Sequence, residues 1–159
     1  MRFACRPVDA SFFERAPTIH RIELDLPASA ERVFSVLEDG EAWTRWFPEI
    51  QRVTWTSPSP LGIGTTRTVA LTSITVDEYF FEWEPGRRFS FYFTQATRPL
   101  ARSFAESYRL SPTGPQTCRF TWVIAYQLRF PFFLAGALVR ARFEKMFRNA
   151  AAGLARYLS

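Results

Sequence analysis

The chain has 159 residues, of which 47% are hydrophobic and 22% charged, and its formal net charge is +5. This length and composition are typical of one globular domain and exclude a disordered or collagen-like chain. The basic residues are scattered singly with acidic residues between them, which argues against a nucleic-acid partner. The aromatic content is high, at 17% of the chain, and it indicates either a bulky core or the wall of a cavity for a flat, greasy ligand.

The hydrophobic runs of the sequence show no targeting or membrane-spanning signal. The first residues open no hydrophobic run of the signal-peptide kind. The longest uncharged apolar stretch, 130–139, is about half the length that spans a bilayer. Cys5 and Cys118 lack metal-ligand spacing, and two such thiols fit a reducing compartment. We therefore expect a soluble cytoplasmic protein without an integral membrane segment.

The first third of the chain predicts a strand and two short helices. Residues 1–18 read as an irregular N-terminal arm, and residues 19–159 as a single domain. Residues 19–26 alternate and predict a strand. Ser29 is then a suitable N-cap for a short helix that ends near Asp39-Gly40. Residues 41–47 make a second short helix before Pro48.

A meander of strands and a closing helix make up the rest. The expected strands span residues 50–57, 65–71, 74–84, 87–96, 103–111 and 117–130. Within the last of these, Cys118 to Phe130 alternate without a fault, which predicts one face on a core and one near water. After Pro131 the apolar period becomes that of a helix, which continues to Leu158.

The fold class predicted from this order is α+β. A curved antiparallel sheet of seven strands wraps around the long C-terminal helix, and two short helices follow the first strand.

Six segments of the chain carry a family resemblance. They are Pro27–Asp39, Trp43–Ile50, Gly62–Arg67, Trp83–Phe89, Thr117–Trp122 and Leu154–Leu158. In this order they resemble the polyketide cyclase/dehydrase branch of the START-like (SRPBCC, Bet v 1-like) superfamily over about residues 19–158. The resemblance implies a helix-grip fold with a cavity between the sheet and the terminal helix. It implies no particular reaction, because such proteins bind hydrophobic ligands, cyclise polyketides or transfer lipids.

Strand pairing predicts which side chains share the inner wall. A hairpin with Leu110 opposite Cys118 would place four cross-strand pairs of residues on one inward surface. In that register Tyr108 faces Phe120, Glu106 faces Trp122, and Phe104 faces Ile124.

Glu106 is the one carboxylate on this apolar face. Its burial is costly unless it is paired, protonated or open to a wet cavity. In a cavity its pKa would rise, and it could exchange a proton with a ligand. The alternative is a structural ion pair or a water-facing strand end.

The neighbouring hairpin requires a choice between two turn lengths. Phe89, Phe91 and Phe93 should point inward. An odd-length turn at Pro85-Gly86 sets Tyr79, Phe81 and Trp83 beside them, whereas an even one sets Glu78 and Glu82 there. Burying two carboxylates against three rings is the worse choice, so we predict the odd turn. Arg67 and Glu78 then form an outward cross-strand pair.

His20 is the only histidine, at the start of the first strand. It is either a catalytic base or, more commonly in this position, a partly buried structural residue. A single His leaves almost no material for a Ser-His-Asp or zinc site. No glycine-rich phosphate loop is present either, so we expect no metal and no cofactor.

Leu134 and Leu138 lie on the back of the last helix. We expect them to pack under a loop. If exposed beside Arg129, Arg140 and Arg142, they offer a weak contact for a membrane or a second copy of the chain.

Three functions remain open. The first is binding of a small hydrophobic, aromatic or lipid-like ligand, with Glu106 as polar anchor. The expected ligand-binding residues are Trp43, Phe47, Trp83, Phe89, Phe91, Phe93, Glu106, Tyr108, Trp122, Tyr126, Phe143, Met146 and Phe147. The second is a cyclase or dehydratase with Glu106 and Tyr108 in acid/base roles. The third is a lipid carrier or protein-interaction module.

Overall fold

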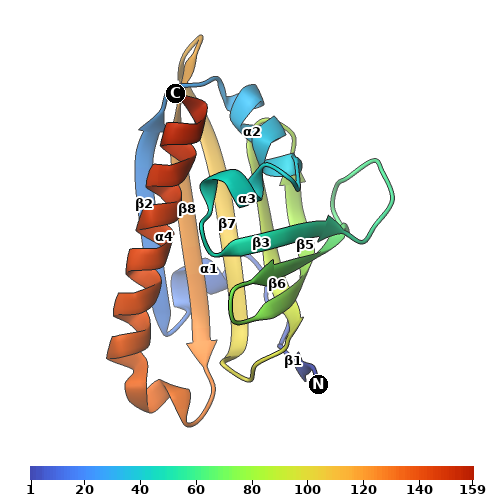
Figure 1. The fold of residues 1–159 in the computed structure, drawn as a ribbon, viewed down its shortest axis with the longest axis vertical. Coiled ribbons are helices and arrows are strands. Elements are labelled where there is room, and N and C mark those ends of the chain that lie inside the picture. Colours follow the sequence, from blue (N-terminus) through green and yellow to red (C-terminus); the bar gives the residue numbers. More distant parts are fainter.

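The main element of the computed structural model, which describes residues 1–159, is one antiparallel sheet (Figure 1). Its strands lie in the order β2-β8-β7-β6-β5-β4-β3. They are β2 (Thr18–Leu26), β3 (Ile50–Trp55), β4 (Thr66–Leu71), β5 (Thr75–Glu84), β6 (Arg88–Ala96), β7 (Ala101–Gly114) and β8 (Thr117–Leu128). The predicted seven-stranded sheet is confirmed, and the two-residue strand β1 (Phe3–Ala4) pairs with the end of β6.

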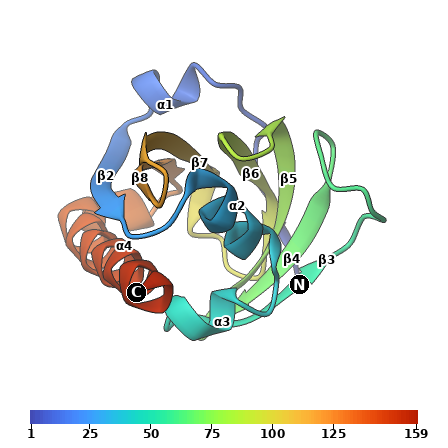
Figure 2. The same cartoon turned by 90° about the horizontal axis from the view of Figure 1, so that it is seen from above.

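The sheet curls into a half-barrel whose open side is closed by helices (Figure 2). The long helix α4 (Gly136–Leu158) follows the 3-10 turn η1 (Phe132–Ala135) and packs against β2. The short helix α3 (Trp43–Trp46) bridges from α4 to β3 at the opposite edge. Helix, bridge and sheet together enclose the interior, which is the predicted α+β helix-grip arrangement.

The helix α2 (Ala30–Glu38) begins as its sequence predicts. The hydroxyl of Ser29 accepts a hydrogen bond from the backbone N–H of Arg32 at 3.2 Å, and Glu31 lies in the first turn. Val33, Phe34 and Leu37 are buried. The helix therefore covers one end of the half-barrel with its apolar side (Figure 2).

The N-terminal arm is more ordered than predicted. Besides β1, it forms the single-turn helix α1 (Phe12–Arg15), which lies outside the barrel against β7 and β8. Val123 and Ala125 of β8 are consequently buried, although the alternation placed them near water. Phe13 stacks on Phe81 of β5 at 6.2 Å between ring centroids. One helical turn is too short to give a periodic signal, so the sequence could not show this cover.

The last hairpin has a different register from the predicted one. Leu110 lies opposite Phe120, where Cys118 was expected, and Tyr108 lies opposite Trp122. Glu106 accordingly faces Ile124, and Phe104 faces Tyr126. A shift of two residues keeps each side chain on its face, so the predicted inward surface is correct although its pairs are not.

The hairpin of β5 and β6 combines the predicted turn with an unpredicted bulge. Trp83 pairs with Phe89, as the odd-length turn requires, but the register shifts between Phe80 and Glu82. The bulge turns Phe80 and Glu78 inward, where both are buried, and leaves Tyr79 and Phe81 half-buried on the outer face. The predictions that Tyr79 and Phe81 face inward and that Glu78 faces outward are therefore wrong.

The start of the C-terminal helix also differs from the prediction. Leu134 and Leu138 are 70% and 72% exposed, so no loop covers them. The apolar stripe is buried only further along the helix, where Phe147, Ala150 and Leu154 pack into the core.

Candidate functional site

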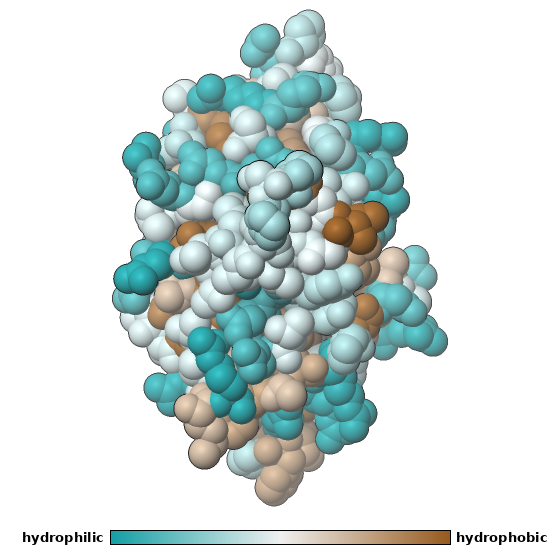
Figure 3. All heavy atoms as spheres, turned by 90° about the vertical axis from the view of Figure 1, so that its right-hand side faces the viewer, coloured by the Kyte–Doolittle hydropathy of each residue, from teal (hydrophilic) through white to brown (hydrophobic).

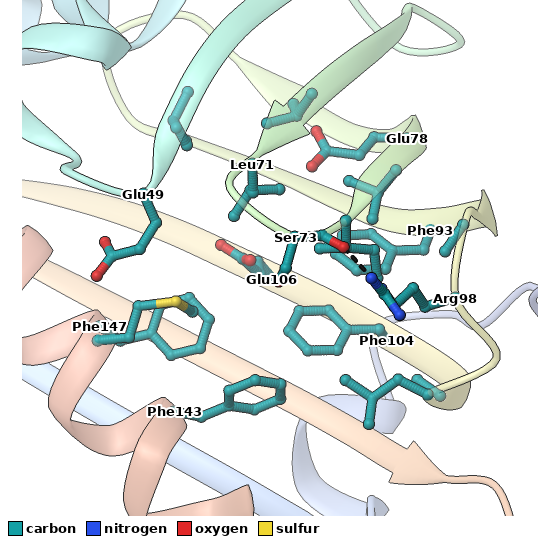
Figure 4. Close-up of a pocket in the computed structure, with 18 of the residues that line it drawn as sticks. Glu49, Leu71, Ser73, Glu78, Phe93, Arg98, Phe104, Glu106, Phe143 and Phe147 are labelled. Carbon is teal, nitrogen blue, oxygen red and sulfur yellow. Dashed lines mark hydrogen bonds between the residues drawn. The ribbon is translucent and has the colours of Figure 1, made fainter.

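A pocket of about 850 Å³ lies between the sheet, α3 and α4 (Figure 4). Hydrophobic residues form 19 of the 30 that line it. Its inner end is formed by buried side chains, among them Trp43, Phe91 and Tyr108. Its mouth is formed by the β4–β5 turn, the β6–β7 loop and one side of α4. The curled sheet thus leaves a volume that its own rings do not fill.

Most of the predicted wall residues line this pocket. They are Trp43, Phe47, Phe91, Phe93, Glu106, Tyr108, Phe143, Met146 and Phe147. Phe143 of α4 lies against Phe104 of β7 (Figure 4), edge to face at 6.1 Å between ring centroids. Phe104 also stacks on Phe93 at 4.3 Å between centroids. It was predicted to face inward but was not among the expected ligand-binding residues.

Four of the predicted wall residues lie outside the pocket, in the core. They are Trp83, Phe89, Trp122 and Tyr126. Trp83 packs edge-on against Phe34 of α2, at 5.7 Å between centroids. Trp122 is covered by Phe47 and Phe147, which stand between it and the open volume. All four keep their predicted inward direction, but other rings cover them.

Glu106 is buried at 6% exposure and lines the pocket. Its Oε2 accepts hydrogen bonds from the hydroxyl of Tyr108 at 2.6 Å and from the indole N–H of Trp122 at 2.9 Å. Burial, and then the charge of Glu78, raise the pKa of Glu106 from 4.5 to about 7. The two hydrogen bonds and Arg67 oppose that rise. Glu106 is therefore a carboxyl group that changes charge near neutral pH.

The phenol of Tyr108 is buried with Glu106. Burial, and then the charge of Glu106, raise its pKa well above 10.0. The group is consequently neutral over the physiological range, and its proton points at Glu106. To donate a hydrogen bond to a ligand, it would have to release the carboxylate.

An ion pair lies beside these two residues, at the inner end of the pocket. Arg67 and Glu78, at 2% and 4% exposure, are joined by a hydrogen bond from Arg67 Nε to Glu78 Oε2. The guanidinium lies 4.6 Å from the ring centroid of Trp43 and 4.9 Å from that of Phe91. Its Nη1 has no hydrogen-bond partner. Burial raises the pKa of Glu78, and the charge and hydrogen bond of Arg67 oppose the rise.

This pair was predicted as cross-strand neighbours, and β4 and β5 do pair them. The prediction was wrong about the face, because it weighed the two carboxylates of β5 without the cation that accompanies one of them. Arg67 neutralises Glu78 and is in turn enclosed by aromatic faces, which attract a cation.

The mouth of the pocket has polar residues that sequence reasoning did not single out. Arg98 Nε donates to the backbone carbonyl of Ser73 at 2.8 Å, which joins the β6–β7 loop to the β4–β5 turn. Glu49 lies on the other side of the opening (Figure 4), and its buried Oε2 has no partner. Arg142 and Lys145 of α4 also line the mouth. Only their place on the folded chain brings these residues together.

His20 lies outside the pocket and joins three elements. Its Nδ1 lies 2.5 Å from Glu144 Oε2 of α4, and its Nε2 lies 2.9 Å from the hydroxyl of Tyr126. The hydrogen bond with His20 lowers the pKa of Glu144. The geometry corresponds to the structural interpretation of His20, because it fastens α4 to β2 and β8.

Metal-ligating residues are not gathered anywhere in the molecule. No group of three or more His, Cys, Asp or Glu side chains has a metal-binding arrangement. Cys5 and Cys118 are free and buried. No helix is both long and apolar enough to cross a membrane.

Comparison with known proteins agrees with this geometry. The family described as polyketide cyclase / dehydrase and lipid transport matches residues 20–159. An uncharacterised protein of Mycobacterium tuberculosis is 40% identical over 152 residues, covering 92% of this chain and 90% of the relative. A START superfamily protein from Mycobacterium smegmatis superposes with a TM-score of 0.76 at 16% identity, covering 88% of this chain and 96% of that chain. The di-domain ARO/CYC BexL from the BE-7585A biosynthetic pathway superposes with a TM-score of 0.72 at 18% identity, covering 88% and 46%.

The half-barrel that wraps around a long helix over an internal pocket defines a helix-grip protein, with the fold of the START superfamily structure. Within that class, the chain belongs to the polyketide cyclase / dehydrase and lipid transport family. The family and fold connect it with hydrophobic ligand binding or a polyketide cyclase-like role.

Proposed function

We propose that this protein binds a small hydrophobic or aromatic molecule in the pocket between the sheet and α4. The observation that carries the proposal is the volume of about 850 Å³ that remains open in a chain with 17 Phe, 5 Trp and 5 Tyr. Pockets of this size and apolar lining are those that enclose small organic ligands. A chain selected only for a dense core would fill such a space with its rings.

The inner end of the pocket supports a ligand that carries an oxygen atom. Arg67 Nη1 is buried without a partner, which is costly unless an acceptor reaches it. Both hydrogen bonds to Glu106 end on Oε2, so Oε1 has none. A hydroxyl group at the inner end of the ligand would accept from Arg67 Nη1 and donate to Glu106 Oε1. A carbonyl group would accept from Arg67 Nη1, and from Glu106 only when Oε1 carries the proton. The proposed contacts are therefore apolar along the wall and polar at Glu106 and Arg67.

Native mass spectrometry of the freshly purified protein tests this function. We expect a mass excess that denaturation releases as a small apolar molecule. The variant Met146→Trp, which adds bulk to a pocket-lining position of α4, should lose it. Ala152→Trp is the matched control, because Ala152 is exposed on the same helix. The proposal fails if the wild type retains neither a co-purified molecule nor added N-phenyl-1-naphthylamine.

The alternative function is that of a cyclase or dehydratase acting on a polyketide-like chain. The buried carboxyl of Glu106, with its pKa of about 7, favours this alternative. As a carboxylate, Glu106 would remove a proton from the carbon between two carbonyls, and the new carbanion would close the ring. The alkoxide formed on the attacked carbonyl would take this proton back from Glu106 and become a hydroxyl group. Glu106 would then remove the second proton of the same carbon and pass it to the hydroxyl, which leaves as water while a carbon–carbon double bond forms. Tyr108, which donates to Glu106, would hold the carboxylate in place.

Turnover of a synthetic poly-β-keto thioester distinguishes the enzyme from a binding protein. The absorbance of the aromatic product should rise with the wild type, and Glu106→Gln should slow that rise by about a hundredfold or more. Glu41→Gln, at an exposed position, is the control. Equal rates for the wild type and Glu106→Gln would exclude an acid/base role of Glu106 and leave ligand binding as the one remaining function.

The cellular setting and the lipid-carrier alternative belong to the same proposal. Two free, buried thiols suit the cytoplasm, which keeps cysteines reduced. A carrier would hold a lipid-like molecule in this same pocket.

A further inference from the structure

One end of the molecule exposes an unusual amount of apolar surface. Six large hydrophobic side chains are exposed in the chain, and four of them lie between the end of β8 and the first turn of α4. This apolar tip consists of Phe130, Phe133, Leu134 and Leu138, which are 74%, 54%, 70% and 72% exposed. Figure 3 shows apolar colour gathered at that lower end of the surface. Such a cluster on a water-facing surface marks a contact site.

The charged residues of the chain segment that carries the tip are all basic. Residues 129–143 contain three arginines, Arg129, Arg140 and Arg142, and no acidic residue. Lys145 follows on the same helix. The first carboxylate after the tip, Glu144, contacts His20 and accepts a hydrogen bond from Arg148. The surface that approaches the tip therefore meets cations around an apolar centre.

The tip also adjoins the mouth of the pocket. Phe132, between two residues of the tip, lines the pocket together with Arg142 and Lys145. The backbone N–H of Arg129 donates to the carbonyl of Leu100 in the β6–β7 loop, which is another part of the mouth. Whatever covers the tip lies beside the entrance.

We propose that the apolar tip docks on an anionic lipid surface, with the mouth of the pocket toward the lipid. The tip projects beyond the end of the sheet (Figure 1), as a wedge that enters the headgroup layer. Its arginines match negative lipid headgroups. A second copy of the chain is disfavoured, because two tips of equal positive charge repel each other. Because the entrance would then face the lipid, an apolar ligand could pass between lipid and pocket without crossing water.

Vesicle co-sedimentation tests the docking without reference to any ligand, so its outcome is independent of the proposed function. The wild type should bind phosphatidylcholine vesicles that contain phosphatidylglycerol and not vesicles of phosphatidylcholine alone. Salt that screens surface charge should weaken the binding. The double variant Leu134→Ser/Leu138→Ser should bind at least about tenfold more weakly. Ile63→Ser is the matched control, because Ile63 is 70% exposed outside the tip.

A second pair of variants measures the contribution of arginine charge to vesicle binding. Arg140→Gln should weaken binding about fivefold, the effect of one cation near an anionic surface. Arg156→Gln, at the other end of the same helix, should leave binding unchanged.

Three results would overturn the proposal. The first is no vesicle binding, and the second is equal binding to neutral and anionic vesicles. The third is a concentration-dependent dimer, or retention on polyglutamate, that the double leucine variant abolishes while vesicles are not bound. A dimer would assign the tip to a second copy of the chain, and retention to an acidic protein.

Discussion

Replacing Glu106 by Gln removes a buried charge and keeps the shape of the side chain. The amide oxygen of Gln can still accept from Tyr108 and Trp122, which now donate to the carboxyl at 2.6 and 2.9 Å. The variant therefore resembles the wild type with Glu106 protonated. At low pH we expect the two proteins to have similar free energies of unfolding.

The difference should grow as the pH rises. The pKa of Glu106 is 4.5 without the fold and about 7 within it. Between these values the folded protein holds a proton that the unfolded chain has lost, so the wild type loses stability as the pH increases. At about 1.4 kcal/mol per unit of pKa difference, the loss amounts to about 3 kcal/mol. It is complete above the folded pKa, and Glu106→Gln does not share it.

Urea denaturation of both proteins at several pH values between 4.5 and 8 measures this directly. Glu106→Gln should become the more stable protein above about pH 7, by about 3 kcal/mol. Glu41→Gln, at an exposed position, provides the control and should follow the wild type at every pH. A constant difference between the wild type and Glu106→Gln over this range would exclude a raised pKa of Glu106 in the folded protein. It would mean that the carboxyl group is hydrated in the folded protein.

Two further predictions concern the packing around the pocket. Arg67→Met should destabilise the protein by about 3–5 kcal/mol, because it leaves the buried carboxylate of Glu78 without its cation. The double variant Arg67→Met/Glu78→Gln should recover most of that loss in chemical denaturation, and a double variant no more stable than the single one would contradict the account. Gly153→Ala should cost at least about 2 kcal/mol, because a Cβ there would overlap the backbone carbonyl of Trp46 and push α4 from α3. Gly136→Ala, with open space around it on the same helix, should stabilise by up to about 1 kcal/mol; equal melting temperatures for the two alanine variants would refute this.

The sheet and its helix were predictable because both depend on local periodicity. The alternation after Cys118 became β8, and the helical period after Pro131 became α4. The cap of α2 by Ser29 was also predictable, because it depends only on residues next to Ser29 in the sequence. The cover of β8 by α1 was not predictable, because one turn at Phe12–Arg15 has no period to detect.

The strand registers were only partly predictable, because they depend on bulges. β7 runs to Gly114, the hairpin turns at residues 115–116, and a bulge between Pro112 and Gly114 changes the pairing by one residue, so that Leu110 lies opposite Phe120. Another at Phe81 reverses the faces of β5 beyond it. The first bulge lies between Pro112 and Gly114, which indicate a break in the strand but not the register on either side of it. The second has no Gly or Pro beside it, and the free energy that fixes it comes from partners on other strands.

The site was predicted as a set of inward residues, but its division into core and wall was not. Trp122 and Tyr126 point inward as expected, yet side chains of other elements cover them. That division depends on how α3 and α4 sit over the sheet. The inward position of Glu78 likewise depends on Arg67, a cation from a neighbouring strand that compensates its charge.

Titration with N-phenyl-1-naphthylamine measures whether the pocket accepts a small hydrophobic molecule. The emission of this neutral dye rises and shifts to the blue when it leaves water for an apolar cavity. We predict saturable binding at one site per chain, which Met146→Trp abolishes and Ala152→Trp preserves. Unchanged binding in Met146→Trp, or no saturable binding by the wild type, would show that this pocket does not hold the dye.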